Sequence, residues 1–165
     1  MTDDKRPDFE DAVTAELPVM YRVARRLTLD PVEAEDLVGQ VLLRAARAWC
    51  SFDGRHTRSW LLKILRNEHV LALRRKAARP RTIGLEAAGE AGSFTEPAIV
   101  GETTSGILNA LDGLPEEYRL AVALCDVEEM SYREAAKAMD VPLGTVRSRL
   151  YRGRQMLRET LGGFC

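Results

Sequence analysis

The chain has 165 residues, with 24 Lys and Arg against 25 Asp and Glu, and a formal net charge of -1. This length allows one ordinary domain or two small ones. It contains no apolar run of eighteen residues, and its polar, acidic start does not match a secretory signal, so we expect a cytoplasmic protein without membrane insertion. Cys50, Cys125 and Cys165 are widely spaced, without a CxxC motif or a neighbouring histidine, so neither a disulfide framework nor a metal site is indicated and no cofactor is expected.

The first eighty residues are predicted to form a helical domain. A helix is expected from Phe9 to Leu27, with a break or kink at Pro18 because proline lacks an amide donor. The run Asp30-Pro31-Val32-Glu33 favours a second helix start, with Asp30 as N-cap, Pro31 at the first helical position and Glu33 placed to close a capping box. Apolar residues then recur at helical spacing to about Trp49.

A third amphipathic helix is expected after the turn at residues 51–54. From Arg55 to Arg81 the sequence holds nine basic residues and one acid, Glu68, for a local charge of +8. Such a patch suits a nucleic-acid partner. Residues 81–106 are predicted to be a linker, because from Thr82 to Gly106 there are four glutamates, five glycines and no basic residue.

Residues 107–165 are predicted to contain a helix-turn-helix, in the stretch SYREAAKAMDVPLGTVRSRLYRGRQML from Ser131 to Leu157. Ser131 and Glu134 form a capping box, and Pro142 interrupts the helix that starts near Tyr132. A second helix is expected from about Leu143, with an apolar stripe at Val146, Leu150, Gly153 and Leu157.

Five arginines and no acid lie between Val141 and Arg158, as expected for a helix that reads a major groove. A solvated helix with a basic outer face is the simpler interpretation of the same residues. The fold class that the whole sequence indicates is all-α, with two small helical domains and a flexible linker.

The order of these parts resembles a bacterial sigma factor of the extracytoplasmic-function group. The likeness covers nearly the whole chain and rests on two motif sets: in the N-terminal part AEDLV (residues 34–38), Leu43-Arg44-Ala45 and Arg58-x-Trp60-Leu61-x-x-Ile64-x-x-Asn67, and in the C-terminal part Leu114-Pro115, residues 131–136, residues 144–150 and Arg152-x-Arg154.

The resemblance implies a protein that binds core RNA polymerase, directs it to promoters and helps to open the DNA. The expected partners are the largest-subunit coiled coil and flap of core RNA polymerase, promoter DNA and an anti-sigma factor. The implied polymerase contacts lie on the helix that follows Pro31, at Glu35, Asp36, Gln40 and Arg44. A plain solvated helix face is the alternative for these residues.

The resemblance also implies a surface for the minus-10 element and for promoter opening. Its candidate residues come from the loop after Cys50 and from the basic helix: Arg55, His56, Arg58, Trp60, Lys63, Arg66, Asn67, Arg74 and Arg75. Trp60 has helical spacing with Leu61 and Ile64, which is more often typical of a core residue. We expect His56 and His69 to be solvated or capping residues and not ligands.

The minus-35 element would be read by the second helix of the helix-turn-helix. The candidate contacts are Thr145, Arg147, Ser148, Arg149, Tyr151 and Arg152, with a bracing role as the alternative for Arg149. In this family the linker threads toward the RNA exit channel, where its glutamates could mimic nucleic acid, although a plain tether explains them as well.

Two other functions remain open from the sequence. A stand-alone helix-turn-helix regulator would account for the C-terminal half but does not need the AEDLV motif. A sigma-like decoy that binds polymerase without opening promoters fits the departures from the family pattern at Gly39, Gln40 and Thr57. An enzyme is the least supported class, because the sequence shows no nucleophile and base pair, metal cluster or phosphate loop.

Overall fold

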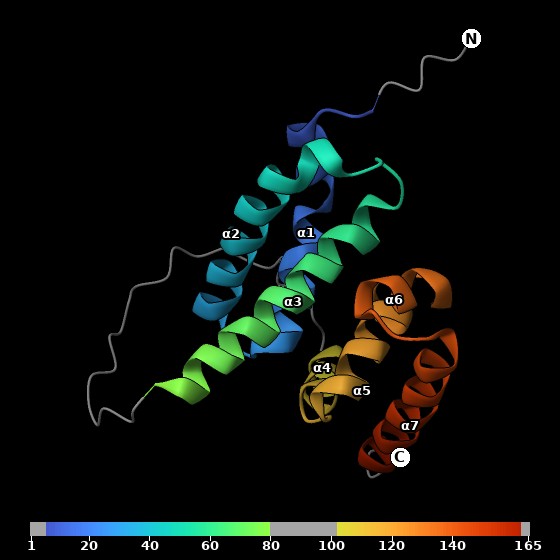
Figure 1. Cartoon of the computed structure of the whole chain (residues 1–165). Helices are drawn as coiled ribbons and strands as arrows, with labels where there is room; N and C mark the ends of the chain where they lie inside the picture. Colours follow the sequence, from blue (N-terminus) through green and yellow to red (C-terminus); the bar gives the residue numbers. More distant parts are fainter. Residues whose placement is uncertain (1–5, 80–101, 163–165) are drawn as a thin grey trace.

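The computed structural model describes residues 6–79 and 102–162, and all the regular elements in these two ranges are helices (Figure 1). The first range forms three helices, α1 (Phe9–Thr28), α2 (Pro31–Ala48) and α3 (Thr57–Ala78), with a short 3-10 turn at Trp49–Ser51. The all-α prediction is therefore confirmed. Of the linker predicted at 81–106, residues 81–101 lie outside the described residues.

Helix α1 runs through Pro18 without interruption, so the break predicted there is absent. Proline in a helix interior costs about 3 kcal/mol or more. The neighbouring side chains of Val19 and Met20 are buried, as are those of Val13 and Val23. Packing of this apolar face keeps the helix intact, since tertiary contacts supply most helical stability in proteins.

The start of α2 follows the predicted chemistry in part. The Asp30 side chain accepts a hydrogen bond of 2.9 Å from the amide of Glu33, and Pro31 takes the first helical position. The Glu33 carboxylate does not close the capping box, because it pairs with Lys76 of α3. The Asp30 side chain thus satisfies one backbone amide in the first turn of α2. The Glu33 side chain instead joins α2 to α3.

The second described range forms α4 (Glu102–Asp112), α5 (Glu116–Val122), a π-helical segment (Ala123–Val127), α6 (Tyr132–Met139) and α7 (Leu143–Leu161). Helix α4 begins inside the predicted linker, so residues 102–106 are helical. Helices α6 and α7 begin at the predicted residues, Tyr132 and Leu143, and α7 continues past the predicted stretch to Leu161.

Helix α6 begins with the capping box that the sequence predicts. Ser131 accepts from the Glu134 amide at 3.2 Å, and the Glu134 carboxylate accepts from the Ser131 amide at 2.9 Å. Asp140 ends α6 in the left-handed region with φ 54°, and Pro142 precedes α7. These two residues set the tight turn between the helices.

The apolar stripe of α7 faces inward as predicted. Val146 and Leu150 are fully buried, and Gly153 lies where α7 crosses α5. A Cβ atom at Gly153 would approach Val122 Cγ2 to 2.9 Å and Tyr118 Cβ to 3.4 Å. Glycine is therefore required for the close approach of these two helices.

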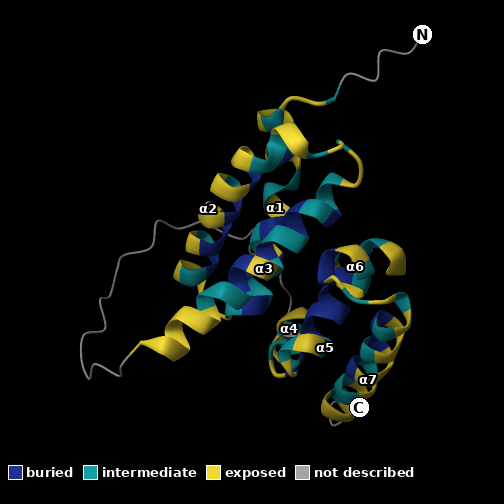
Figure 2. Ribbon diagram, viewed as in Figure 1, coloured by how far each residue is buried: buried dark blue, intermediate teal, exposed yellow. Residues whose placement is uncertain are grey.

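The two helical units touch each other. Helix α6 packs against α3, and α5 packs against α1, so that the buried side chains form one continuous cluster from α1 to α7. Figure 2 shows the buried surfaces of α3 and α6 turned toward each other, with the exposed residues on the outer faces.

A matched pair of glycine substitutions tests this packing. Gly153→Ala should lower the free energy of unfolding by about 1–3 kcal/mol, because overpacking forces α5 and α7 apart. Gly39→Ala should raise it by up to about 1 kcal/mol, because Gly39 is exposed within α2 and an added Cβ atom would meet nothing within 4 Å. Urea unfolding measures both, and equal effects of the two substitutions would contradict the packing described for Gly153.

Candidate nucleic-acid and polymerase interfaces

The outer face of α7 carries most of the residues predicted to read DNA. Arg147, Ser148, Tyr151 and Arg152 are exposed, and 71% of the Tyr151 surface is accessible. Thr145 is half-buried, and its carbonyl accepts a 3.0 Å hydrogen bond from the Ser148 hydroxyl. The exposed four share one side of the helix because Val146, Leu150 and Gly153 hold the opposite side in the core.

Arg149 differs from its neighbours on α7. It is half-buried, and its guanidinium lies 3.9 Å from the Glu117 carboxylate of α5. A residue that reads DNA would be exposed and would not need an ion pair with α5. The contact with Glu117 therefore supports the bracing alternative for Arg149.

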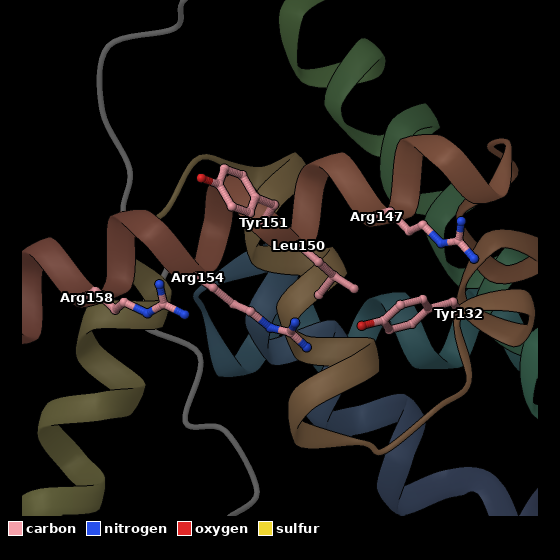
Figure 3. A pocket seen from close by; sticks show the side chains of 6 residues that line it. All are labelled: Tyr132, Arg147, Leu150, Tyr151, Arg154 and Arg158. Atoms are coloured by element: carbon pink, nitrogen blue, oxygen red, sulfur yellow. The ribbon is translucent and has the colours of Figure 1, made fainter.

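A shallow cavity of about 150 Å³ opens beside the outer face of α7 (Figure 3). It is lined by Tyr132, Arg147, Leu150, Tyr151, Arg154 and Arg158. The Arg154 guanidinium donates two hydrogen bonds to Asp126, at 2.9 and 2.6 Å. Its pKa is raised first by this hydrogen-bonded contact and then by Tyr132, so Arg154 is a fixed cation.

Tyr132, Arg154 and Arg158 were not among the predicted site residues. Arg154 does belong to the Arg152-x-Arg154 motif, so its presence in the sequence was a usable signal. Its fixed position could not be predicted, because it depends on Asp126, which is 28 residues away in the chain.

The loop before α3 carries the predicted base-capturing residues. Arg55 and His56 are exposed, and His56 occupies the N-cap position of α3 with φ 53° and no side-chain capping bond. The loop packs on an aromatic cluster of Phe9, Trp49, Phe52 and Trp60.

Trp60 is half-buried in this cluster. Its ring stacks on Phe52 with centroids 4.1 Å apart and an interplanar angle of 15°. It also lies 5.9 Å from Trp49, whose ring is covered on another side by the Arg6 guanidinium at 4.7 Å. Trp60 therefore supports the loop through ring contacts, which favours the core alternative for this residue.

Some basic side chains of α3 are paired with carboxylates and others are exposed. Arg58 is paired with Glu16 at 2.7 Å, and Lys63 lies 3.5 Å from Asp140 of the second unit. Arg66 contacts the Asn67 side chain at 3.4 Å. Arg74 and Arg75 are exposed in the last turns of the helix. The predicted minus-10 cations are thus spread along the whole helix.

The predicted polymerase-binding residues lie on α2. Asp36, Gln40 and Arg44 recur every four residues and are exposed, whereas Glu35 is half-buried and lies off this row. Arg44 donates a 2.9 Å hydrogen bond to Glu68 of α3. Asp36, Gln40, Leu37 and Leu73 help to line a groove of about 190 Å³ between α2 and α3.

His69 contradicts its sequence prediction, because it is buried with 4% of its surface accessible. Its Nε2 atom lies 3.1 Å from the Glu116 carboxylate of α5. The neighbouring Glu68 is also buried. Both continue the stripe of Leu61 and Leu65, so helical spacing was the signal that indicated burial.

Comparisons with known proteins agree with this geometry. Residues 12–79 match the family model of Sigma-70 region 2, and residues 105–157 match that of Sigma-70, region 4. The chain is 30% identical to the ECF RNA polymerase sigma factor SigW of Bacillus subtilis, over 93% of this chain and 88% of that protein. It belongs to the family of ECF RNA polymerase sigma factors.

Two further relatives define how far the likeness extends. The chain is 35% identical to the ECF RNA polymerase sigma factor SigE of Mycolicibacterium smegmatis over 94% of its own length, but it spans only 62% of that relative. The structure of the sigma factor RpoE in complex with the anti-sigma factor NepR from Bartonella quintana superposes with a TM-score of 0.72 and 27% identity, covering 94% of this chain and 97% of that one. Both helical units of this sigma factor therefore have the family fold.

Among the described residues, no helix combines the length and the hydropathy that a membrane span requires.

The thiols of the described residues give a test of the contacts around α7. Burial raises the pKa of Cys125 to about 11, and Asp126 raises it further while Arg154 opposes the shift. At pH 8 only about one thiol in a thousand is then a thiolate. Iodoacetamide should modify Cys125 about 100-fold more slowly than exposed Cys50, with a rate that rises tenfold per pH unit up to about pH 11. Peptide mass mapping separates the sites, and equal rates at pH 8 would contradict the burial of Cys125.

Proposed function

We propose that this chain is an alternative sigma factor, which binds core RNA polymerase, directs it to specific promoters and helps to open them. The observation that carries the proposal is the presence of two separate surfaces in one chain of the ECF family. One is the arginine-bearing outer face of α7, and the other is the basic helix α3 beside the exposed row on α2. A stand-alone regulator needs the first surface but not the second.

In this proposal α7 enters the major groove at the minus-35 element. Exposed Arg147, Ser148, Tyr151 and Arg152 reach base edges or phosphates, while Thr145 contributes near the helix start and Arg149 braces α7 against α5. Phosphate contacts supply most of the affinity and make it depend strongly on salt, and one or two side chains supply the sequence preference. The Arg154 cation, fixed by Asp126, adds a positioned phosphate contact.

The first unit acts at the minus-10 element. Opening a promoter requires a surface that holds unstacked bases and neutralises the backbone of a single strand. We assign the backbone contacts to the cations of α3 and the base contacts to the loop of Arg55 and His56. Trp60 keeps this loop in place by stacking on Phe52.

Polymerase docking is assigned to α2. Asp36, Gln40 and Arg44 form one exposed row that can meet the coiled coil of the largest subunit, with Glu35 at its edge. The second unit would contact the polymerase flap. Residues 1–80 and 107–165 then work as two modules, the second extended by α4 from residue 102.

An anti-sigma factor is the further partner that the likeness to NepR-bound RpoE supports. Because transcription takes place on the chromosome, the chain would act in the cytoplasm. It would perform no bond chemistry itself, since the polymerase makes the RNA.

Transcription from purified components tests the proposal. The chain is added to core RNA polymerase with genomic promoter fragments, and the run-off transcripts are sequenced. We expect initiation at a defined set of start sites that are absent without the chain. Binding to polymerase without initiation would support a decoy, and promoter binding without polymerase would support a stand-alone regulator. Either result would reject the sigma-factor proposal.

The division of labour between the helices is tested by reciprocal substitutions. Arg147→Ala or Arg152→Ala should weaken minus-35 recognition about tenfold, because a good arginine contact is worth about 1–3 kcal/mol, and should leave polymerase binding intact. Asp36→Ala should weaken polymerase binding and leave minus-35 recognition intact. Polymerase pull-down and promoter competition assays measure the two properties, and circular dichroism verifies folding. Loss of polymerase binding in the folded Arg147→Ala chain would refute the assignment.

A further inference from the structure

Four side chains that line the cavity beside α7 form one row on this helix. Arg147, Tyr151, Arg154 and Arg158 follow one another at i, i+4, i+7 and i+11, which is the spacing of one helix face. Within residues 6–79 and 102–162, Arg147 and Arg158 form no ion pair, whereas Arg154 is bound by Asp126. Arg154 is therefore the arginine of this row whose guanidinium is held in one place before a ligand arrives.

The contact between Asp126 and Arg154 is bidentate. Arg154 donates from Nε to Oδ2 at 2.9 Å and from Nη2 to Oδ1 at 2.6 Å. Exposed ion pairs contribute little in general, but a contact through two parallel hydrogen bonds fixes the orientation of the guanidinium as well as its position. The Arg154 and Asp126 side chains are 40% and 35% exposed, so the pair stays accessible to a ligand. Because Asp126 uses Nε and Nη2, the third nitrogen, Nη1, is left for another partner.

Tyr132, the first residue of α6, approaches the same guanidinium. Figure 3 shows its hydroxyl directed toward the Arg154 side chain. The hydrogen-bonded contact with Asp126 raises the pKa of Arg154, and Tyr132 raises it further. The Arg154 side chain thus connects α7 with α6 and with the segment that carries Asp126.

A π-helical turn brings Asp126 to α7. The Glu128 amide donates to the Ala123 carbonyl at 2.9 Å, which is an i to i+5 bond that adds one residue to the turn. Ala123 and Leu124 stay buried, whereas Asp126 is exposed beside α7. Single π turns occur frequently at functional sites. The irregular turn therefore accompanies the placement of a carboxylate against the outer face of α7.

A carboxylate beside a DNA-binding face has two opposing effects on affinity. Its charge repels phosphates, but water and salt screen exposed charges beyond about 8–10 Å, so we expect this repulsion to change affinity by less than about twofold. Ordering a mobile arginine during binding lowers affinity by about 2- to 12-fold. Asp126 removes this cost, because it holds Arg154 before DNA arrives. The second effect is the larger one.

We propose that Asp126 is a positioning residue for DNA binding by α7, because its carboxylate fixes the Arg154 guanidinium with Nη1 free to meet a DNA phosphate. The role rests on the proposed function, in which α7 enters the major groove. A negatively charged side chain then raises the affinity for a negatively charged ligand. Asp126 itself does not touch the DNA.

Promoter competition with polymerase assembled from each variant tests this role. Asp126→Asn removes one negative charge and the bidentate contact, and it should weaken promoter binding about threefold to tenfold. Glu129→Gln removes the same charge at an exposed residue nearby and should change binding by less than about twofold. Equal or tighter promoter binding by the Asp126→Asn holoenzyme would overturn the proposal, because tighter binding is what the loss of repulsion alone would give.

Two further variants separate positioning from a folding defect. Asp126→Glu keeps both carboxylate oxygens and should bind the promoter within about twofold of wild type. Arg154→Lys keeps the charge of residue 154 but not the planar fork that a bidentate contact needs. In an Arg154→Lys chain, the additional change Asp126→Asn should therefore no longer weaken binding. A further threefold loss in this double variant, with wild-type helix content by circular dichroism, would refute the assigned pair.

The order of Arg154 is measured without DNA. In the NMR spectrum of the free chain near neutral pH, the Arg154 Nε–H group should give a resolved, slowly exchanging signal, which Asp126→Asn should abolish. Signals of equal intensity in both chains would refute the fixed guanidinium. Unchanged affinity of Asp126→Asn at a promoter that the wild-type holoenzyme binds rejects the positioning role alone. Failure of the wild-type holoenzyme to bind any promoter would instead reject the sigma-factor proposal, and the positioning role with it.

Discussion

The architecture depends on helix α3, which packs against α1, α2 and α6 and reaches α5 through His69. Helix α3 buries Leu61 and Leu65 against α1 and α2, and it packs on α6 of the second unit. Its stripe continues through Glu68 and His69, which are held by Arg44 of α2 and Glu116 of α5. Glu68 and His69 thus lie where the core of the first unit ends and the interface with the second unit begins. The remaining surface of α3 is left for basic side chains.

Local chemistry made much of this fold predictable. The Asp30 cap, the Ser131 and Glu134 capping box and the stripe through Val146 and Leu150 depend on residues within one or two turns, and the structure confirms all of them. The predictions at Pro18 and His69 failed for different reasons. Helix α1 continues through Pro18 because its neighbours Val19 and Met20 are buried. His69 lies on the buried stripe of α3, and its partner Glu116, 47 residues away, could not be predicted from the local sequence. The same limit applies to the site, where exposure of Arg147 and Arg152 was predictable but the pairing of Lys63 with Asp140 was not.

The two proposed DNA-binding surfaces differ in how far they are exposed. The outer face of α7 is exposed, so the side chains of Arg147 and Arg152 are open to solvent. The first unit has Lys63, Arg22 and Arg26 engaged with carboxylates of the second unit. Of these three cations only Lys63 is a proposed minus-10 contact, and its pair with Asp140 joins the two units.

In the proposed function, one chain delivers polymerase to two separated promoter elements and opens the DNA at one of them. Permanganate and nuclease footprinting of the chain with core polymerase, at a promoter it activates, tests this function. We expect two separate protected segments, with reactive unpaired thymines only at the downstream segment. A single protected site without unpaired thymines, unchanged when polymerase is omitted, would contradict it.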